Sequence, residues 1–278
     1  MTTLPRQSQG WQAYLKLGLA RQGDRTILAK REHNGPLVVQ KPFYPEKETC
    51  HIYLLHPPGG VVGGDHLTLD VNVGAGANAL ITTPAATKFY RSNGATAIQQ
   101  QLLQAENNGT LEWLPQETIL FAGSRAEMST HVNLAPHAHF IGWEILCLGR
   151  PACSEIFDRG YCRQRLEIWR DNKPLLIERA LLEGNNTTLS AAWGLASYPV
   201  MGTLVATPAN HEIVNSVREK IGSVDQALFS VTLLDDTLVC RYLGHQGELA
   251  KQIFIKVWEN IRPGLTGKSA CPPRIWNT

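Results

Sequence analysis

The segment Leu67-Thr-Leu-Asp-Val-Asn-Val73 decides the fold class. Its apolar residues alternate with Thr68, Asp70 and Asn72, and Gly74-Ala-Gly76 follows directly. Successive side chains of a β-strand point to opposite faces, so strict alternation is typical of a strand with one buried face. The sequence therefore predicts a sheet that covers a core on one side.

Turn residues join further strand-like runs in three places. Asn107-Asn-Gly109 lies between runs 99–104 and 110–114, and Asp171-Asn-Lys-Pro174 lies between runs 161–170 and 175–182. Asp235-Asp236 separates runs 228–234 and 237–242. Asn, Asp and Gly tolerate the positive φ of tight hairpin turns. We expect three antiparallel hairpins.

Two segments in the last third have helical spacing instead. Ile213, Val214, Val217 and Ile221 follow Asn210, a suitable N-cap residue. A broad apolar face spans 247–261 and precedes Pro263-Gly264, where we expect the helix to end. This face suits packing on the sheet better than contact with a partner.

These elements predict a mainly β protein. We expect a single large antiparallel β domain over residues 1–278, with two α-helices toward the C-terminal part.

Composition excludes several classes of protein. The chain has 278 residues, of which 18% are charged, and a net charge of +2, so there is no electrostatic case for nucleic acid or a membrane surface. The start, 1–10, has no apolar signal-peptide core, and the apolar run 141–148 is far shorter than the ~20 residues of a membrane helix. We expect a cytoplasmic protein whose six cysteines are reduced and mostly buried.

The glycine-rich segment after His56 fits the first part of a phosphate-binding loop. Gly59 and Gly64 have the required spacing, but Asp65 and His66 follow where Lys and Ser/Thr are needed. A carboxylate at that place repels phosphate. We interpret the segment as a stiff, sharply turned loop that presents Asp65.

Candidate ligands and acid–base groups are few. Imidazoles suit nickel and similar ions, and His56, His137 and His139 are weak candidates, the last two facing one way only if they share a strand. Glu144 and Glu178 interrupt apolar runs. They face outward, or they pair with Arg150 or Arg179, or they line a polar interior channel that supplies water.

Five ordered blocks resemble the UreD (also UreH) family of urease accessory proteins. They extend from about residue 50 to the C-terminus. The blocks are Tyr53-Leu-Leu-His-Pro-Pro-Gly-Gly-Val-Val-Gly-Gly-Asp65, Leu80-Ile-Thr-Thr-Pro-Ala-Ala-Thr-Lys-Phe-Tyr-Arg-Ser92, Leu114-Pro-Gln-Glu-Thr-Ile119, Gly142-Trp-Glu-Ile-Leu-Cys-Leu-Gly-Arg-Pro151 and Pro272-Pro-Arg-Ile-Trp-Asn-Thr278.

The resemblance implies a urease maturation factor and not an enzyme. Members of the family act with UreF and with UreG, the GTPase, which agrees with the missing phosphate loop. They dock on the urease apoprotein and are thought to pass nickel to its active site through an internal, water-filled tunnel. The implied cofactor status is transient nickel only, with no tightly bound group, and the implied fold is largely β with two helices.

The resemblance also carries over residues. Asp65 matches the aspartate that closes the glycine motif and is the first candidate for nickel transfer, and Glu144, Arg150 and Glu178 match polar tunnel positions. A structural or partner-contact motif comprises Gly59, Gly60, Gly63, Gly64, Thr87, Lys88, Tyr90 and Arg91. Two alternatives stay open: a scaffold that bridges urease and the GTPase without conducting nickel, and a hydrolase that uses Asp65 and Glu144.

Overall fold

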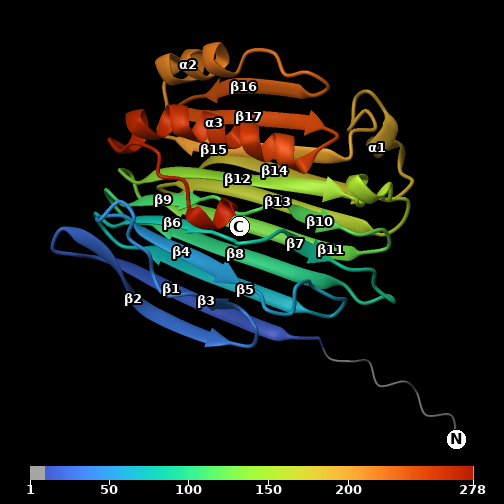
Figure 1. The fold of residues 1–278 in the computed structure, drawn as a ribbon, viewed down its shortest axis with the longest axis horizontal. Helices are drawn as coiled ribbons and strands as arrows, with labels where there is room; N and C mark the ends of the chain where they lie inside the picture. The colour runs from blue at the N-terminus through green and yellow to red at the C-terminus, as the bar shows by residue number, and fades with distance from the viewer. Residues whose placement is uncertain (1–9, 278) are drawn as a thin grey trace, which may run out of the picture.

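Two β-sheets face each other, and helices cover one of them (Figure 1). The computed structural model describes residues 10–277. The seven-stranded sheet has the order β14 (Lys173–Glu183), β13 (Tyr161–Arg170), β11 (Arg125–Leu134), β8 (Ala97–Ala105), β5 (His66–Val73), β1 (Gln12–Gln22) and β2 (Arg25–Asn34).

The ten-stranded sheet lies against it. Its order is β16 (Leu228–Leu234), β17 (Thr237–Gly244), β15 (Val200–Thr207), β12 (His139–Leu148), β9 (Thr110–Trp113), β6 (Asn78–Thr82), β4 (Cys50–Leu55) and β3 (Val38–Val39), and β10 (Thr118–Leu120) joins β12 to β7 (Thr87–Phe89).

Most neighbouring strands in the middle of both sheets are parallel. β5 pairs in parallel with β1 and β8, and β4, β6, β9 and β12 form a parallel series. From β4 to β13 the chain mostly passes from one sheet to the other after each strand, so it winds in a solenoid-like way. The mainly β prediction is confirmed, but the antiparallel one is wrong, because alternation reveals a buried face and not the direction of the neighbouring strand.

One of the three predicted hairpins is wrong for the same reason. Asn107-Asn-Gly109 connects β8 to β9, which belong to different sheets. The hairpins β13–β14 and β16–β17 are confirmed. Their turns place Asp171, Asn172 and Asp235 at positive φ, as the turn residues predicted.

The helices agree with the predicted pattern, with two corrections. α2 (His211–Ile221) begins as predicted, with the Asn210 side chain accepting from the Ile213 N–H. α3 (Gly247–Thr266) does not end before Pro263 but continues through it to Gly267, whose φ is +70°. Buried Arg262 and Leu265 hold this last turn against the protein, which offsets the missing N–H of the proline. A third helix, the one-turn α1 (Thr187–Ser190), was not predicted.

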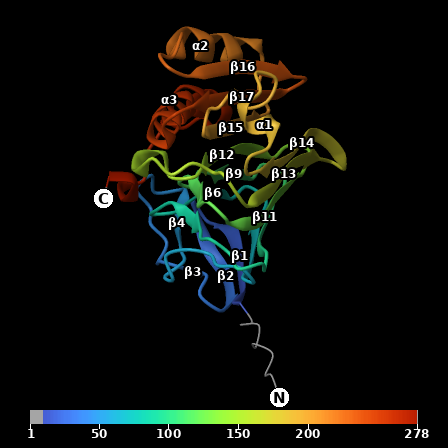
Figure 2. The ribbon, with the colours of Figure 1, turned by 90° about the vertical axis from the view of Figure 1, so that its right-hand side faces the viewer.

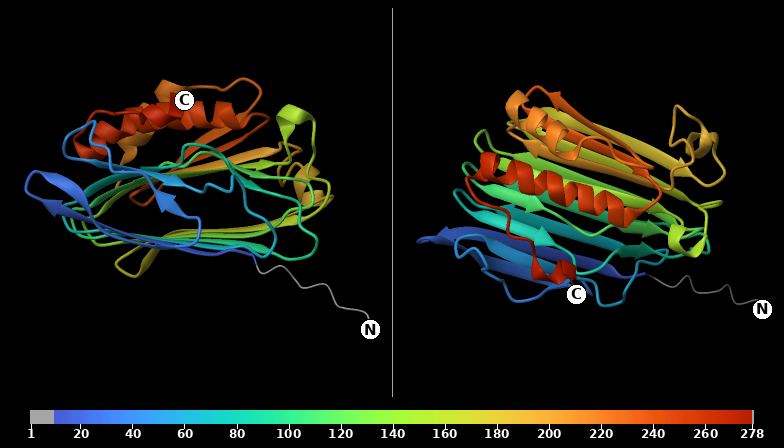
Figure 3. Two further views of the ribbon diagram at one scale, coloured as in Figure 1. Left: turned by 60° about the horizontal axis from the view of Figure 1, so that its bottom comes forward. Right: turned by 45° about the horizontal axis from the view of Figure 1, so that its top comes forward.

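The helices gather at one end of the layered sheets. Figures 1 and 2 place α2 and α3 beside β15–β17, far from β1 and β2, and Figure 3 shows α3 lying across the sheet. Ile253, Phe254, Val257 and Trp258 of α3 are buried in one apolar cluster with residues of β12, β15 and β17. The prediction that this apolar face packs on the sheet is confirmed.

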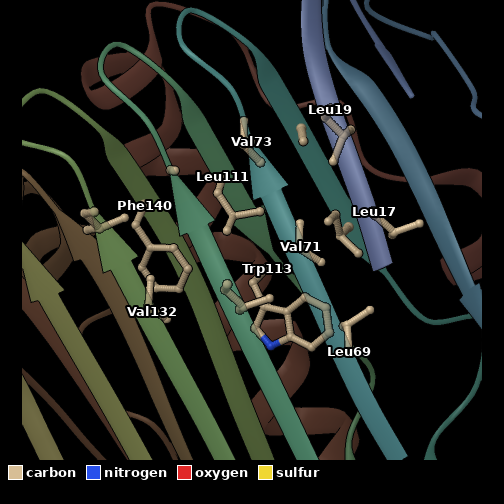
Figure 4. Close-up of a cluster of buried hydrophobic side chains, with 14 of the residues drawn as sticks. Leu17, Leu19, Leu69, Val71, Val73, Leu111, Trp113, Val132 and Phe140 are labelled. Atoms are coloured by element: carbon tan, nitrogen blue, oxygen red, sulfur yellow. The ribbon is translucent and has the colours of Figure 1, made fainter. Parts of the chain in front are cut away.

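Two separate apolar clusters fill the space between the sheets. The larger contains Leu17, Val71, Val132 and Phe140 (Figure 4). The other contains residues such as Leu67, Ala126 and Cys162, from the same strands nearer their other ends. The interior is therefore divided, and the division positions the candidate site.

Several further predictions concern the whole chain. No helix within residues 10–277 is long and apolar enough to cross a membrane. All six cysteines are free, and Cys50, Cys147, Cys162 and Cys240 are buried. The start of the chain, where the sequence predicts no signal peptide, lies outside the described residues up to position 9. The expectation of a single domain stays a prediction.

Candidate functional site

A row of polar side chains separates the two interior apolar clusters, and we call it the polar seam. Its members occupy inward positions of adjacent strands in both sheets. The polar seam comprises Gln101 of β8, Thr130 of β11, Gln164 of β13 and Glu178 of β14 in the seven-stranded sheet, and Glu144 of β12, Thr203 of β15 and Arg241 of β17 in the ten-stranded sheet.

Glu144 lies at the centre of the polar seam and contacts the opposite sheet with both oxygens. Gln164 Nε2 donates to Glu144 Oε2 at 2.5 Å, and the Thr130 hydroxyl lies against Glu144 Oε1. Burial, with the nearby negative charge of Glu178, raises the pKa of Glu144, although the bonds to Thr130 and Gln164 oppose this. Glu144 therefore holds a proton more readily than an exposed glutamate.

A protonated Glu144 also fits the hydrogen bonds of its neighbours. Thr130 Oγ1 lies 2.7 Å from Gln101 Oε1 as well as against Glu144, but one hydroxyl has a single proton to donate. If Glu144 donates to Thr130, the threonine is free to donate to Gln101. The three groups then form one satisfied chain between the sheets.

Glu178 continues the polar seam toward the edge of the sheets. Thr203 Oγ1 donates to Glu178 Oε2 at 3.2 Å, and the Arg241 guanidinium forms an ion pair with Glu178 Oε1. Arg179 instead bonds to Glu167 on the outer face. Glu144 and Glu178 therefore neither face outward nor pair with Arg150 or Arg179, and both lie on the inner faces of their strands. That they line a channel stays a prediction.

Two cavities adjoin the polar seam. The first, of about 440 Å³, is lined by Gln101 and Glu144 together with His56, Gly60 and Lys88. The second, of about 930 Å³, is lined by Gln164, Glu178, Thr203 and Arg241. Glu144 lines the first cavity and Gln164 the second, and a hydrogen bond joins these two side chains.

The glycine loop forms part of the wall of the first cavity. A Cβ on Gly60 would lie 2.2 Å from the Tyr90 ring, and one on Gly63 would lie 2.3 Å from Ser92 Oγ. Gly59 and Gly64 have φ values of +77° and +95°, which favour glycine. The stiff loop predicted from the sequence is therefore present, and its glycines fit it against the second block.

The sequence predicts a loop that presents the Asp65 carboxylate, but in the structure this carboxylate is buried and bonded to the backbone. The residue is 1% exposed, Oδ1 accepts from the Trp11 N–H at 2.8 Å, and Oδ2 accepts from the Val62 N–H at 2.9 Å. The carboxylate thus ties the loop to the chain that enters β1. It is not among the residues that line either cavity.

Some residues of the second family block, 80–92, line the first cavity, and others support the glycine loop. Thr87 and Lys88 line the first cavity, and the Lys88 carbonyl accepts from the Val61 N–H at 2.7 Å. Tyr90 packs edge-on against Phe121, with ring centroids 5.0 Å apart. These contacts hold the glycine loop in place from the side of β7.

Arg150 and Arg91 lie apart from the polar seam. Arg150 is exposed, pairs with Glu155 and stacks over Phe121 at 4.6 Å, and both arginines line a separate surface pocket of about 380 Å³. The structure therefore does not bring Arg150 together with Glu144 and Glu178, although the resemblance grouped them.

The histidine candidates separate clearly. His56 lines the first cavity, burial lowers its pKa despite the charge of Asp65, and its buried Nε2 has no hydrogen-bond partner within residues 10–277. His137 lies in a turn and His139 begins β12, so the condition that both share a strand fails. Over the same residues, no group of three or more His, Cys, Asp or Glu is arranged to hold a metal ion.

Sequence reasoning missed five members of the polar seam, and three of the strands carry a signal for theirs. In β8 and β11 the inward positions are apolar except near the middle of the strand, and in β13 Gln164 lies between the inward apolar residues Cys162 and Leu166. A polar residue on an apolar face is a recognisable exception. The missed residues are Gln101, Thr130, Gln164, Thr203 and Arg241.

The fold and the site define a β-sandwich protein in which a polar seam with two adjoining cavities separates two apolar clusters. The hydrolase alternative paired Asp65 with Glu144, but the Asp65 carboxylate bonds to backbone amides and is not among the residues that line the cavity at Glu144.

Comparison with known proteins gives the family. The family model described as UreD urease accessory protein matches residues 12–277. A protein of Brucella anthropi named urease accessory protein UreD 2 is 46% identical over 273 residues, covering 98% of this chain and all of that protein. The UreD proteins of Alcanivorax borkumensis (48% identity; 97% of this chain and 93% of theirs) and Klebsiella aerogenes (44%; 99% and 100%) are similar over nearly their whole length. The chain belongs to the UreD family of urease accessory proteins, which are maturation factors and not catalytic enzymes.

Proposed function

We propose that this chain delivers nickel to apo-urease by passing the ion along the polar seam. The supporting observation is that Glu144 lines one cavity and Glu178 lines the other, along a polar seam that separates the two interior apolar clusters. In this proposal the chain acts in the cytoplasm, docked on the urease apoprotein together with UreF and UreG. Nickel is cargo, held transiently.

The chemistry of the polar seam suits an ion that must be released. Carboxylate, amide and hydroxyl oxygens bind nickel, but separate oxygens give a weaker site than a closed set of imidazoles or thiolates. Glu144 would exchange its proton for the ion, because a cation favours the ionised carboxylate. His56, with a free and neutral ring nitrogen at the first cavity, is a further ligand along the same path.

Urease activation at limiting nickel tests the proposal. Glu144→Gln and Glu178→Gln keep the shape of each side chain but remove its charge, so each is expected to lower activation by about tenfold, the loss of about 1.4 kcal/mol of ion binding. The matched control is Glu127→Gln, which alters an outward glutamate that pairs with Arg163 on the opposite face. The control is expected to activate normally.

The same variants test the alternative that the chain is only a scaffold. A pull-down with apo-urease, UreF and UreG is expected to recover all three variants equally, because the changed side chains are interior or remote. Full activation by both Glu144→Gln and Glu178→Gln would contradict nickel passage through the polar seam and favour a bridging role alone.

A further inference from the structure

An ion pair between Arg241 and Glu178 lines one side of the second cavity. Arg241 and Glu178 come from different sheets, and their side chains are 44% and 29% exposed. Thr203, which lies opposite Arg241 in the β15–β17 register, bonds to the other oxygen of the same carboxylate. Both oxygens of Glu178 are therefore engaged.

The Arg241 guanidinium stands where a divalent cation would have to bind. A guanidinium does not lose its proton in proteins, so it cannot be neutralised to make room. A divalent cation on Glu178 Oε1 would also repel the guanidinium at short range. The two cations therefore compete for a single carboxylate.

Arg241 has a route out of the site. Nearly half of its side chain is exposed, so it can turn into solvent without opening the apolar clusters. The exposed ion pair that it leaves contributes little to stability. Displacing the Arg241 guanidinium therefore costs the fold little. Once the guanidinium has left, Glu178 carries a single cation, the entering ion.

We infer that Arg241 is a displaceable plug on Glu178, which a divalent cation must replace before it enters the second cavity. This inference rests on the proposed function, because it concerns the same path. An entering ion takes the place of the guanidinium on Glu178. When the ion moves on toward Gln164 and Glu144, Arg241 returns and closes the cavity behind it.

Nickel binding by the full chain tests the plug without urease. We would titrate Ni²⁺ into the tag-free wild type, Arg241→Gln, Glu178→Gln and the double variant, and follow the heat of binding. Arg241→Gln is expected to bind Ni²⁺ about three- to fivefold more tightly, because the competing cation is gone and a partly exposed ion pair is weak. The double variant is expected to lose this gain, because the carboxylate is gone as well.

An arginine on the opposite face of the sheet provides the control. Arg163 of β13 forms an ion pair with Glu127 on the outer face, with side chains 58% and 38% exposed. Arg163→Gln removes the same charge and is expected to leave Ni²⁺ affinity within twofold of the wild type. Circular dichroism confirms that each variant is folded before titration.

The outcomes separate the plug from nickel passage itself. Unchanged Ni²⁺ affinity in Arg241→Gln, or a gain that persists in the double variant, would overturn the plug. If that happens while Glu178→Gln still blocks urease activation, nickel passage stands without the plug. If the gain appears and is abolished in the double variant, the plug stands even where Glu178→Gln activates urease normally.

Discussion

The polar seam and a charged cluster beneath α3 both contain buried charge, but they differ in what surrounds it. In the cluster, the fully buried Arg262 guanidinium bonds to Glu112 at 2.9 Å and to Glu46 at 2.7 Å, and Glu46 also lies 2.6 Å from His51 Nε2. Trp258 Nε1 donates to Glu112 at 2.6 Å. The Arg262 and Glu112 charges have several partners each.

The carboxylates of the polar seam have fewer charged partners and lie beside cavities. The Glu144 carboxylate bonds to the neutral side chains of Thr130 and Gln164, and it lines the first cavity. Glu178 bonds to the neutral Thr203 and to the partly exposed Arg241, and it lines the second cavity. The difference teaches how to separate two uses of buried charge. A carboxylate enclosed by fixed cations holds elements together, whereas one beside a cavity can accept another ligand.

The largest expected effect comes from breaking the cluster beneath α3. Arg262→Met would leave Glu112 and Glu46 without their cation, so we expect a loss of about 3–5 kcal/mol in the free energy of unfolding. Urea denaturation measures it. Arg163→Met, which breaks an exposed pair, is the control and is expected to cost less than about 1 kcal/mol. Equal losses in the two variants would contradict the distinction between enclosed and open charge.

A smaller loss in the free energy of unfolding is expected at Asp65. Like the carboxylates of the cluster beneath α3, it has both oxygens bonded and lines neither cavity. Asp65→Ala would leave the part-buried N–H groups of Trp11 and Val62 without their acceptor, at a cost of about 1–3 kcal/mol. Asp65→Asn keeps one acceptor oxygen and is expected to cost less. Urea denaturation checks both. Wild-type stability of Asp65→Ala, combined with failed nickel loading, would return Asp65 to the transfer path.

Local sequence patterns predicted much of the secondary structure because they depend on neighbouring residues. The N-cap at Asn210 and the turn at Asp171-Asn172 are such cases. The direction of the strands was not predictable in this way. Whether a turn such as 107–109 returns along the same sheet or crosses to the other depends on which partner strands are available, and these lie far away in the sequence.

The candidate site was predictable residue by residue but not as a whole. Glu144 and Glu178 stood out because charge interrupts an apolar run. Gln164 could not be assigned to the same site from the sequence, because its place depends on the strand register that sets it beside Met128 and across from Glu144. The resemblance, in turn, grouped Asp65 and Arg150 with these residues, whereas in the structure Asp65 bonds to backbone amides and Arg150 pairs with Glu155 at the surface.

The smallest expected effect is a difference in the sign of pH dependence between the two regions. Burial raises the pKa of Glu144 above its usual 4.5, so its contribution to stability is fully present below that pH and is lost as the pH rises through the folded-state pKa. Burial acts the same way on Glu46, but His51 and Arg262 overcome it and lower that pKa. The contribution of Glu46 is therefore present above pH 4.5 and is lost as the pH falls through its folded-state pKa. Glu144→Gln should gain stability relative to the wild type as the pH rises from 4 to 8, and Glu46→Gln should lose stability relative to the wild type over the same range. Urea denaturation across this series measures both slopes, and slopes of the same sign would show that the two carboxylates do not differ in the way their partners imply.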